Sequence, residues 1–229
     1  MFDEPAREFL PLMLRLFQTN IGEEKCSGVR LRHVSSTAVL PVTLEYSFVE
    51  ASQKGDLEAF RLLYESHKDS VYSIALNFTG GNHETAKDIA QEVFLKLFSS
   101  LKSFRGNANF STWLYRVVVN ACMDEHRRRR RFLPLEDSVP QEKVASCQSQ
   151  ERDTWKDQLA REVGTAIAAL SPKLRLPIVL RYVEGLSYEE IARALGCSAG
   201  TVASRLNRGH KFLARRLHHL RGSAGGGDV

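Results

Sequence analysis

Basic side chains gather toward the carboxyl end of the chain, where no acidic residue lies between Glu190 and Asp228. Seven basic residues fall in this interval: Arg193, Arg205, Arg208, Lys211, Arg215, Arg216 and Arg221. Cations without neighbouring carboxylates are suited to neutralising phosphate groups. The formal net charge of +5 is also positive, as expected for a protein that binds phosphates, but it is small. The position of the basic residues therefore matters more than their number. The pattern indicates a nucleic-acid surface, and the alternative is an ordinary helical hairpin with a solvated basic face.

The elements that must position these bases are two helices joined by a tight turn. Ser187 to Glu190 fits a capping box, in which the serine hydroxyl accepts from the Glu190 amide and the Glu190 carboxylate reaches back. Gly196 then provides a left-handed residue that ends the helix, and Ser198 is placed to cap the next one. This spacing predicts a helix-turn-helix motif. Apolar stripes on the preceding segments, which meet at Ser171-Pro172, would complete a four-helix domain.

The second helix of this motif has one apolar face and one face of small and basic residues. Val202, Leu206 and Leu213 form the inward stripe. Small residues early in a helix let its N-terminus enter a major groove, while bases further along hold phosphates. The alternative for Arg205 is an ion pair with Glu189 or Glu190.

A second nucleic-acid surface is predicted near the middle of the chain, where a loop that bends at Gly106 leads into a helix that Ser111 could cap. One face of that helix carries Trp113, Arg116, Asn120, Asp124 and Arg127, and five consecutive arginines end it at residue 131. Aromatic planes, an amide that reads base edges and phosphate-neutralising charge are what unstacked bases require. The alternative is that Trp113 and Phe110 are core residues and that Asn120 caps another element.

The predicted helix from Glu84 to Phe98 has a different character. Its inward stripe consists of apolar residues, and its opposite face carries Asp88, Gln91 and Glu92 with Leu95 among them. An apolar centre with a charged rim is typical of a protein interface. The alternative is a lone exposed leucine, which is common.

Helical periodicity divides the chain, and no credible β-strand pattern interrupts it. We therefore predict an all-α protein of two small helical domains, at 46–131 and 158–221, with a flexible acidic linker at 132–157. Residues 1–45 are interpreted as an N-terminal extension of unknown function and residues 222–229 as a disordered tail.

Several classes of protein are disfavoured. The cysteines Cys26, Cys122, Cys147 and Cys197 are widely spaced, so neither a disulfide framework nor a metal site is predicted, and reduced thiols in the cytoplasm are expected. No apolar run approaches the roughly 18 residues of a membrane span, so membrane insertion is not expected. Without a P-loop, metal triad or nucleophile–base pair, we expect neither an enzyme nor a cofactor.

Several motifs occur in an order and at separations typical of one family. The residues that carry this likeness are Asp88-Ile89-Ala90-Gln91-Glu92-Val93-Phe94, Phe104-Arg105-Gly106, then Phe110, Trp113, Leu114, Val117, Asn120 and Asp124, and finally Gly185 to Ala192 and Gly200 to Arg208. On these residues the chain resembles bacterial RNA polymerase sigma factors of the extracytoplasmic-function (ECF) group. The resemblance covers about residues 46–220.

The resemblance implies a role for each domain. The first would be sigma region 2, which binds core RNA polymerase and recognises and melts the −10 element. The second would be region 4, whose helix-turn-helix reads the −35 element as duplex. The implied partners are core RNA polymerase, through its β′ clamp and β flap, promoter DNA, and an anti-sigma factor that clamps the two domains.

The resemblance also implies which residues make each contact. Those in the helix that docks on the β′ clamp are Asp88, Gln91, Glu92, Phe94 and Leu95. Those that receive the −10 strand and its flipped base are Phe104, Arg105, Asn107, Asn109, Phe110, Trp113, Arg116, Asn120 and Arg127. Those that contact the −35 duplex are Ser198, Gly200, Thr201, Ser204, Arg205, Arg208 and Lys211.

Two other functions remain open on the sequence. A stand-alone helix-turn-helix repressor or activator would explain the second domain and would bind duplex DNA tightly without a partner. An all-α interaction or sensor module with a basic surface would bind RNA or acidic partners with weak sequence preference and strong salt dependence.

Overall fold

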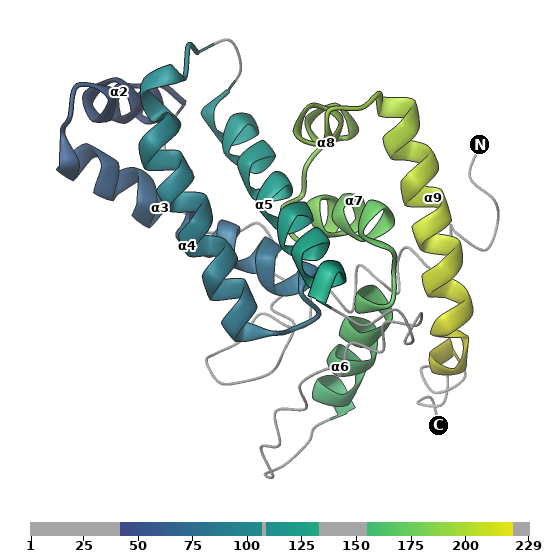
Figure 1. The fold of residues 1–229 in the computed structure, drawn as a ribbon. Helices are drawn as coiled ribbons and strands as arrows, with labels where there is room; N and C mark the ends of the chain where they lie inside the picture. The colour runs from purple at the N-terminus through teal and green to yellow at the C-terminus, as the bar shows by residue number, and fades with distance from the viewer. Residues whose placement is uncertain (1–41, 107–108, 133–154, 222–229) are drawn as a thin grey trace, which may run out of the picture.

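The computed structural model describes residues 42–106, 109–132 and 155–221, and every regular element within these ranges is helical (Figure 1). In chain order these elements are α2 (Val42–Gln53), α3 (Leu57–Phe78), α4 (His83–Ser100), the short 3-10 helix η1 (Leu101–Ser103), α5 (Phe110–Phe132), α6 (Trp155–Ala168), α7 (Pro172–Tyr182), α8 (Tyr188–Leu195), α9 (Ala199–Arg216) and η2 (His218–Arg221). The predicted all-α class is confirmed. The predicted tail and nearly all of the predicted extension and linker lie outside the described residues, although α2 begins ahead of the boundary predicted at residue 46.

Helices α2 to α5 form the N-terminal body. Local capping starts two of them: Asp56 accepts from the amides of Glu58 and Ala59 at 2.9 and 3.1 Å, and Asn82 accepts from the amide of Thr85 at 3.0 Å. Helix α3 packs against both α2 and α4, and α4 packs against α5. The inward stripe predicted for α4 is buried except for its half-buried alanine at position 90, so the helical period identified this face correctly.

Helices α6 to α9, with η2, form the C-terminal body. The capping box between Ser187 and Glu190 is present, Gly196 adopts the left-handed conformation at φ 62°, and the Ser198 side chain accepts from the amide at the start of α9. These predictions are confirmed, as is the start of α7 at Pro172. Helix α9 packs closely on α7 at Gly209. A Cβ added there would lie only 3.1 Å from a side-chain carbon in α7.

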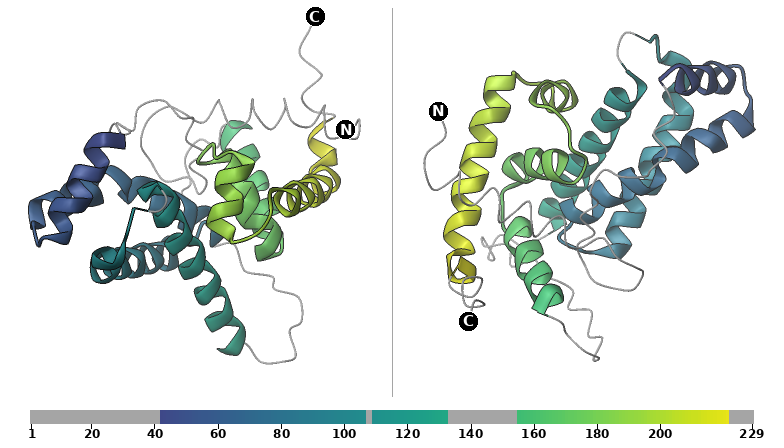
Figure 2. Two further views of the ribbon diagram at one scale, coloured as in Figure 1. Left: turned by 90° about the horizontal axis from the view of Figure 1, so that it is seen from above. Right: turned by 180° about the vertical axis from the view of Figure 1, so that it is seen from behind.

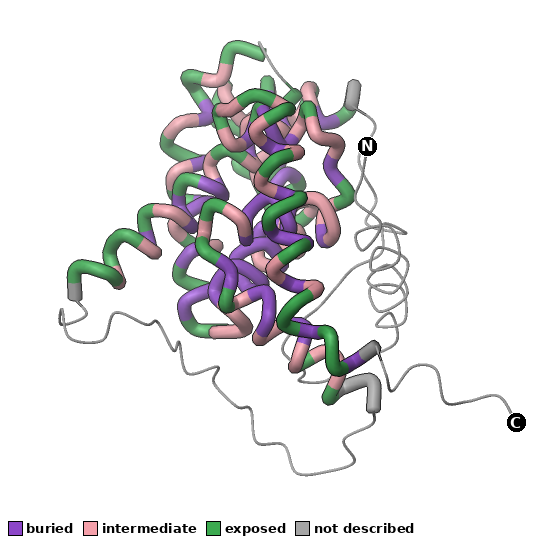
Figure 3. The backbone as a smooth tube through the Cα atoms, turned by 90° about the vertical axis from the view of Figure 1, so that its right-hand side faces the viewer, coloured by how far each residue is buried: buried purple, intermediate pink, exposed green. Residues whose placement is uncertain are grey.

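The two bodies are in contact, which the sequence did not predict. Helix α5 packs on α8, and α3 packs on α6 and α7 (Figures 1 and 2). The guanidinium of Arg175, a buried residue, donates to the carbonyl of Phe78 at the end of α3 and to that of Leu170 at 3.0 Å, and it lies 5.5 Å from the Phe78 ring centroid. The Tyr115 hydroxyl donates to Glu184 Oε2 at 3.3 Å. Buried segments therefore run through the centre of the molecule (Figure 3).

Two of the four cysteines lie in the described residues. Cys122 is fully buried in the N-terminal body, and burial raises the pKa of its thiol. Cys197 is half-buried beside α9. Neither forms a disulfide. Cys26 and Cys147 lie outside the described residues.

Candidate nucleic-acid interface

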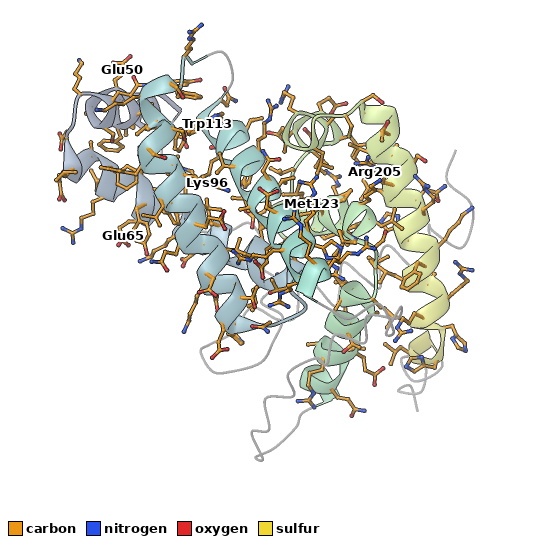
Figure 4. All side chains as sticks on the ribbon, viewed as in Figure 1. Glu50, Glu65, Lys96, Trp113, Met123 and Arg205 are labelled. Carbon is orange, nitrogen blue, oxygen red and sulfur yellow. The ribbon has the colours of Figure 1, made fainter. Side chains whose placement is uncertain are left out.

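The polar face of α9 is open to solvent. Five residues of the predicted set are exposed: Ser198, Gly200, Ser204, Arg208 and Lys211. Thr201 and Arg205 are half-buried, and Nη1 of Arg205 lies 3.9 Å from the sulfur of Cys197 (Figure 4). The opposite stripe of Val202, Leu206 and Leu213 is buried as predicted. The helix can therefore present hydroxyls near its N-terminus and cations further along, the arrangement that fits a major groove.

The loop before α5 and the first turns of that helix form a cluster of aromatic rings. Trp113, near the N-terminal end of α5, is half-buried, and its ring centroid lies 5.2 Å from that of Phe104 and 5.9 Å from that of Phe110 (Figure 4). Phe104 is also half-buried, so it and Trp113 each retain some exposed ring surface. The exposed Arg105 and Asn109 flank them, whereas Asn107 lies outside the described residues.

Phe110 requires a correction, because its side chain is 0% exposed and cannot reach a nucleic acid. It is the first residue of α5, and its ring packs inward against His67 of α3 at 5.5 Å between centroids. Of the two aromatics for which a core position was the alternative, Phe110 is therefore the core residue. Ser111 is also not the cap of α5, because the helix has already begun.

Along the rest of α5, Arg116, Asn120 and Arg127 are exposed on the predicted face. Arg127 donates to Asp124 on the same face at 3.0 Å. The buried carboxylate of Glu125 pairs with the next two arginines of the run. Some arginines of the run are therefore paired within the helix, and Arg116 and Asn120 are the exposed polar residues of α5 closest in sequence to the aromatic cluster.

An apolar groove of about 550 Å³ lies between α3 and α4. Leu95 and Phe98 are 63% and 55% exposed at its edge, although both side chains are apolar. The wall is aromatic: Phe60 pairs with Phe98 at 5.1 Å and Tyr64 with Phe94 at 4.6 Å between ring centroids. We define the docking groove by these six residues: Phe60, Tyr64, Gln91, Phe94, Leu95 and Phe98.

Of the three polar residues predicted beside Leu95, one lines the groove. Asp88 and Gln91 are exposed, and Gln91 lines the groove. Glu92 is half-buried and pairs with Lys96 at 2.6 Å (Figure 4). Sequence reasoning did not predict the aromatic partners in α3, although Phe60 and Tyr64 repeat at the same four-residue spacing as Phe94 and Phe98.

Two family models match the chain within the two bodies: sigma-70 region 2 matches residues 63–132, and sigma-70 region 4 matches residues 160–213. The RNA polymerase sigma-H factor of Pseudomonas aeruginosa is 33% identical over 77% of this chain and 95% of its own length. The ECF RNA polymerase sigma-E factor of Escherichia coli is also similar, at 34% identity over 75% of this chain and 93% of its own length. The chain belongs to the ECF sigma factors.

Among solved structures, the fold of this sigma factor is similar to that of the sigma factor RpoE of Bartonella quintana. The TM-score is 0.59 at 26% sequence identity, covering 71% of this chain and 98% of that one. The protein is therefore a transcription initiation factor that directs RNA polymerase to promoters. None of the described helices is long and apolar enough to cross a membrane.

Proposed function

We propose that this sigma factor engages its partners through three surfaces: the docking groove for core polymerase, the loop–α5 face for the −10 strand, and the α9 face for the −35 duplex. The observation that carries the proposal is that the N-terminal body exposes an apolar groove as well as a base-compatible face. A regulator that acts on duplex DNA alone needs only the helix-turn-helix.

The docking groove has the composition expected for the clamp of core polymerase. Its apolar centre contains Leu95 and Phe98, and the polar residues that line it include Gln91. Asp88 and Glu92 lie on the same helix but do not line the groove. Burial of an apolar centre supplies most of the binding energy in such interfaces, whereas the rim contributes selectivity. The two partly exposed apolar side chains are the anchors of this contact.

For the −10 element, Trp113 and Phe104 supply ring surface, Asn120 an edge-reading amide and Arg116 a phosphate-binding charge. Stacking on an aromatic ring is worth about 1–3 kcal/mol per base, which is comparable with the cost of unstacking that base. The exposed Arg105 and Asn109 complete the contact from the loop. This surface therefore suits a melted strand.

For the −35 element, the N-terminal part of α9 enters the major groove. Ser198, Gly200, Thr201 and Ser204 approach base edges, and the cations Arg205, Arg208 and Lys211 hold the flanking backbone. Because α9 contains no acidic residue, no carboxylate on the helix opposes this contact.

One further partner follows by analogy with a relative. The Bartonella quintana factor was solved in complex with the anti-sigma factor NepR. We infer that this chain also binds an anti-sigma factor, which clamps the two bodies and hides their binding faces. We infer in addition that the C-terminal body contacts the β flap of the polymerase.

The test is Leu95→Asp, with Leu57→Asp as the matched control. Both leucines are strongly exposed, at 63% and 68%, but only Leu95 lines the docking groove. Losing a buried leucine costs about 1.5–3 kcal/mol, so affinity for core polymerase should fall roughly 10- to 100-fold in Leu95→Asp and remain unchanged in Leu57→Asp. Fluorescence anisotropy with purified core polymerase measures this affinity, and circular dichroism confirms that both variants are folded.

Run-off transcription on promoters with randomised −35 and −10 elements tests the DNA surfaces. Transcripts that depend on the protein and share a bipartite motif support the proposal. Unchanged polymerase affinity in Leu95→Asp would refute the groove assignment. Tight, sequence-specific duplex binding by the protein alone, without transcripts, would instead favour a conventional regulator.

A further inference from the structure

Helix α2 lies outside the part of the chain that the region 2 model matches, which begins at residue 63. It packs on α3 and on η1, beside the end of α4 from which the −10 loop departs (Figure 1). We use the name −10 loop for the described residues 104–106 and 109, between η1 and the start of α5. Two polar side chains of α2 contact the two ends of this loop.

Gln53, the last residue of α2, contacts the start of the loop. Its Nε2 donates to the carbonyl of Leu101 at 3.0 Å and to that of Phe104 at 2.8 Å. These two carbonyls lie about fifty positions away in sequence, so the bonds join separate elements. A side-chain amide has two N–H donors, which allows one residue to fix both carbonyls.

Glu45, near the start of α2, contacts the far end of the loop. It is only 6% exposed, and its Oε1 accepts from the hydroxyl of Ser111 at 3.0 Å. The same oxygen lies 2.9 Å from Nε2 of His67 in α3. The carboxylate therefore ties the first turn of α5 to both α2 and α3.

Between these ends the loop turns at Gly106, which has a positive φ of 71°. The nearest atom to a Cβ built there belongs to the ring of Tyr46, at 4.0 Å, so α2 also lies along the turn. Arg105 and Asn109 remain exposed. The loop is thus held at its ends by α2, while the side chains of Arg105 and Asn109 stay available to a ligand.

We propose that α2 acts as a brace that holds the two ends of the −10 loop in place, with Gln53 and Glu45 as positioning residues for base discrimination at the −10 element. Neither residue contacts DNA in this proposal. Restraining the loop before it binds reduces the ordering cost of binding, and it keeps the loop in one shape that accepts one base better than others. The inference rests on the −10 assignment made under the proposed function.

Two variants remove one restraint each. Gln53→Met keeps the length of the side chain but has no N–H donor, and Ser111→Ala removes the hydroxyl while leaving the contact between Glu45 and His67 intact. The matched control is Ser52→Ala, because the Ser52 hydroxyl bonds only within α2, to the carbonyl of Phe48. Thermal unfolding shows whether all three variants are folded. If Gln53→Met does not fold, the comparison of Ser111→Ala with Ser52→Ala tests the proposal.

The measurement is transcription by reconstituted holoenzyme from promoters randomised at the −10 and −35 elements. Preference for the best −10 base should fall about three- to tenfold in Gln53→Met and Ser111→Ala, the order of magnitude associated with losing one hydrogen bond. Preference at −35 and affinity for core polymerase should be unchanged, and Ser52→Ala should match the parent. A weakened fold would lower both preferences together, so the selective loss identifies a positioning role.

Asn109→Ala separates this inference from the function on which it rests. If Asn109→Ala alters −10 preference but folded Gln53→Met and Ser111→Ala do not, the brace is refuted and the −10 assignment stands. If the parent protein shows no −10 preference, both are refuted. Equal losses at −10 and −35 in the brace variants would also overturn the inference.

Discussion

His210 lies on the buried side of α9, with its Nε2 2.8 Å from the hydroxyl of Tyr182 in α7. Burial lowers the pKa of His210 below its usual value and raises the pKa of Tyr182 to about 12. At neutral pH both side chains are therefore uncharged and share one hydrogen bond behind the exposed polar face of the helix. A buried neutral histidine makes the C-terminal body sensitive to acid.

We expect the free energy of unfolding to fall as pH drops below about 6.5, the ordinary pKa of histidine. Below that pH the unfolded chain binds a proton at position 210 that the folded chain does not, whereas above it neither state does. His210→Gln should weaken this dependence. Urea unfolding at pH 7.5 and 5.5 measures it, with His218→Gln, at an exposed position, as the control. Identical pH dependence in the parent and His210→Gln would contradict the prediction.

Single residues also mark the limit of what helical periodicity can predict. The spacing of Trp113, Arg116 and Asn120 identified one face of α5 correctly, because that spacing is a local property of a helix. The burial of Phe110 and the bond of Ser111 to Glu45 depend on α2 and α3, which reach the site only through tertiary packing. No pattern within α5 contains that information.

At the scale of elements, α8 depends strongly on its ends. It has only eight residues, so its backbone hydrogen bonds alone are too few to make it stable. The capping box begins it, and Gly196 ends it in the left-handed conformation. These signals are local in sequence, which explains why the helix-turn-helix was predicted in detail. The docking groove was not, because it forms only when aromatic residues of α3 and α4 are brought together.

Gly196→Ala isolates the backbone contribution of this turn. No atom lies within 4 Å of a Cβ built at Gly196, so the substitution introduces strain in φ without a steric clash. We expect a loss of about 1–2 kcal/mol in the free energy of unfolding. Gly200→Ala, inside α9 with its nearest neighbour at 3.9 Å, should instead raise stability by about 0.5–1 kcal/mol. Urea midpoints at constant m-value measure both, and a loss in both variants would count against this explanation.

At the scale of the whole molecule, the contact between the bodies couples their stabilities. Arg175 links α7 to the end of α3, and Tyr115 of α5 donates to Glu184 in the turn before α8. Burial and the neighbouring Glu184 raise the pKa of Tyr115 well above its usual value, so this phenol remains a donor throughout the physiological range. Sequence patterns did not predict the contact, because it joins elements from opposite halves of the chain.

The fluorescence of Trp113, which lies in α5, reports on the N-terminal body, whereas far-ultraviolet circular dichroism reports on the helices of both bodies. In Trp155→Phe, which keeps Trp113 as its single tryptophan, the urea transitions followed by these two signals should coincide. Arg175→Met should separate them, with the transition of the C-terminal body moving to lower urea, because hydrogen bonds from a charged donor are worth about 1.5–3 kcal/mol. Coincident transitions in Arg175→Met would show that the two bodies are coupled by other contacts.

The positions at which α5 ends and α6 begins have a consequence for promoter geometry. The 22 residues from 133 to 154 join these helices, and a chain of that length spans at most about 75 Å when fully extended. At about 3.4 Å per base pair along a duplex, this tether is equivalent to roughly 20 base pairs. The covalent connection therefore sets the largest distance by which the two bodies, which are in contact in this structure, could separate along DNA. A longer connection would increase this distance, whereas a shorter one would reduce the range of −35 to −10 separations that one molecule can bridge.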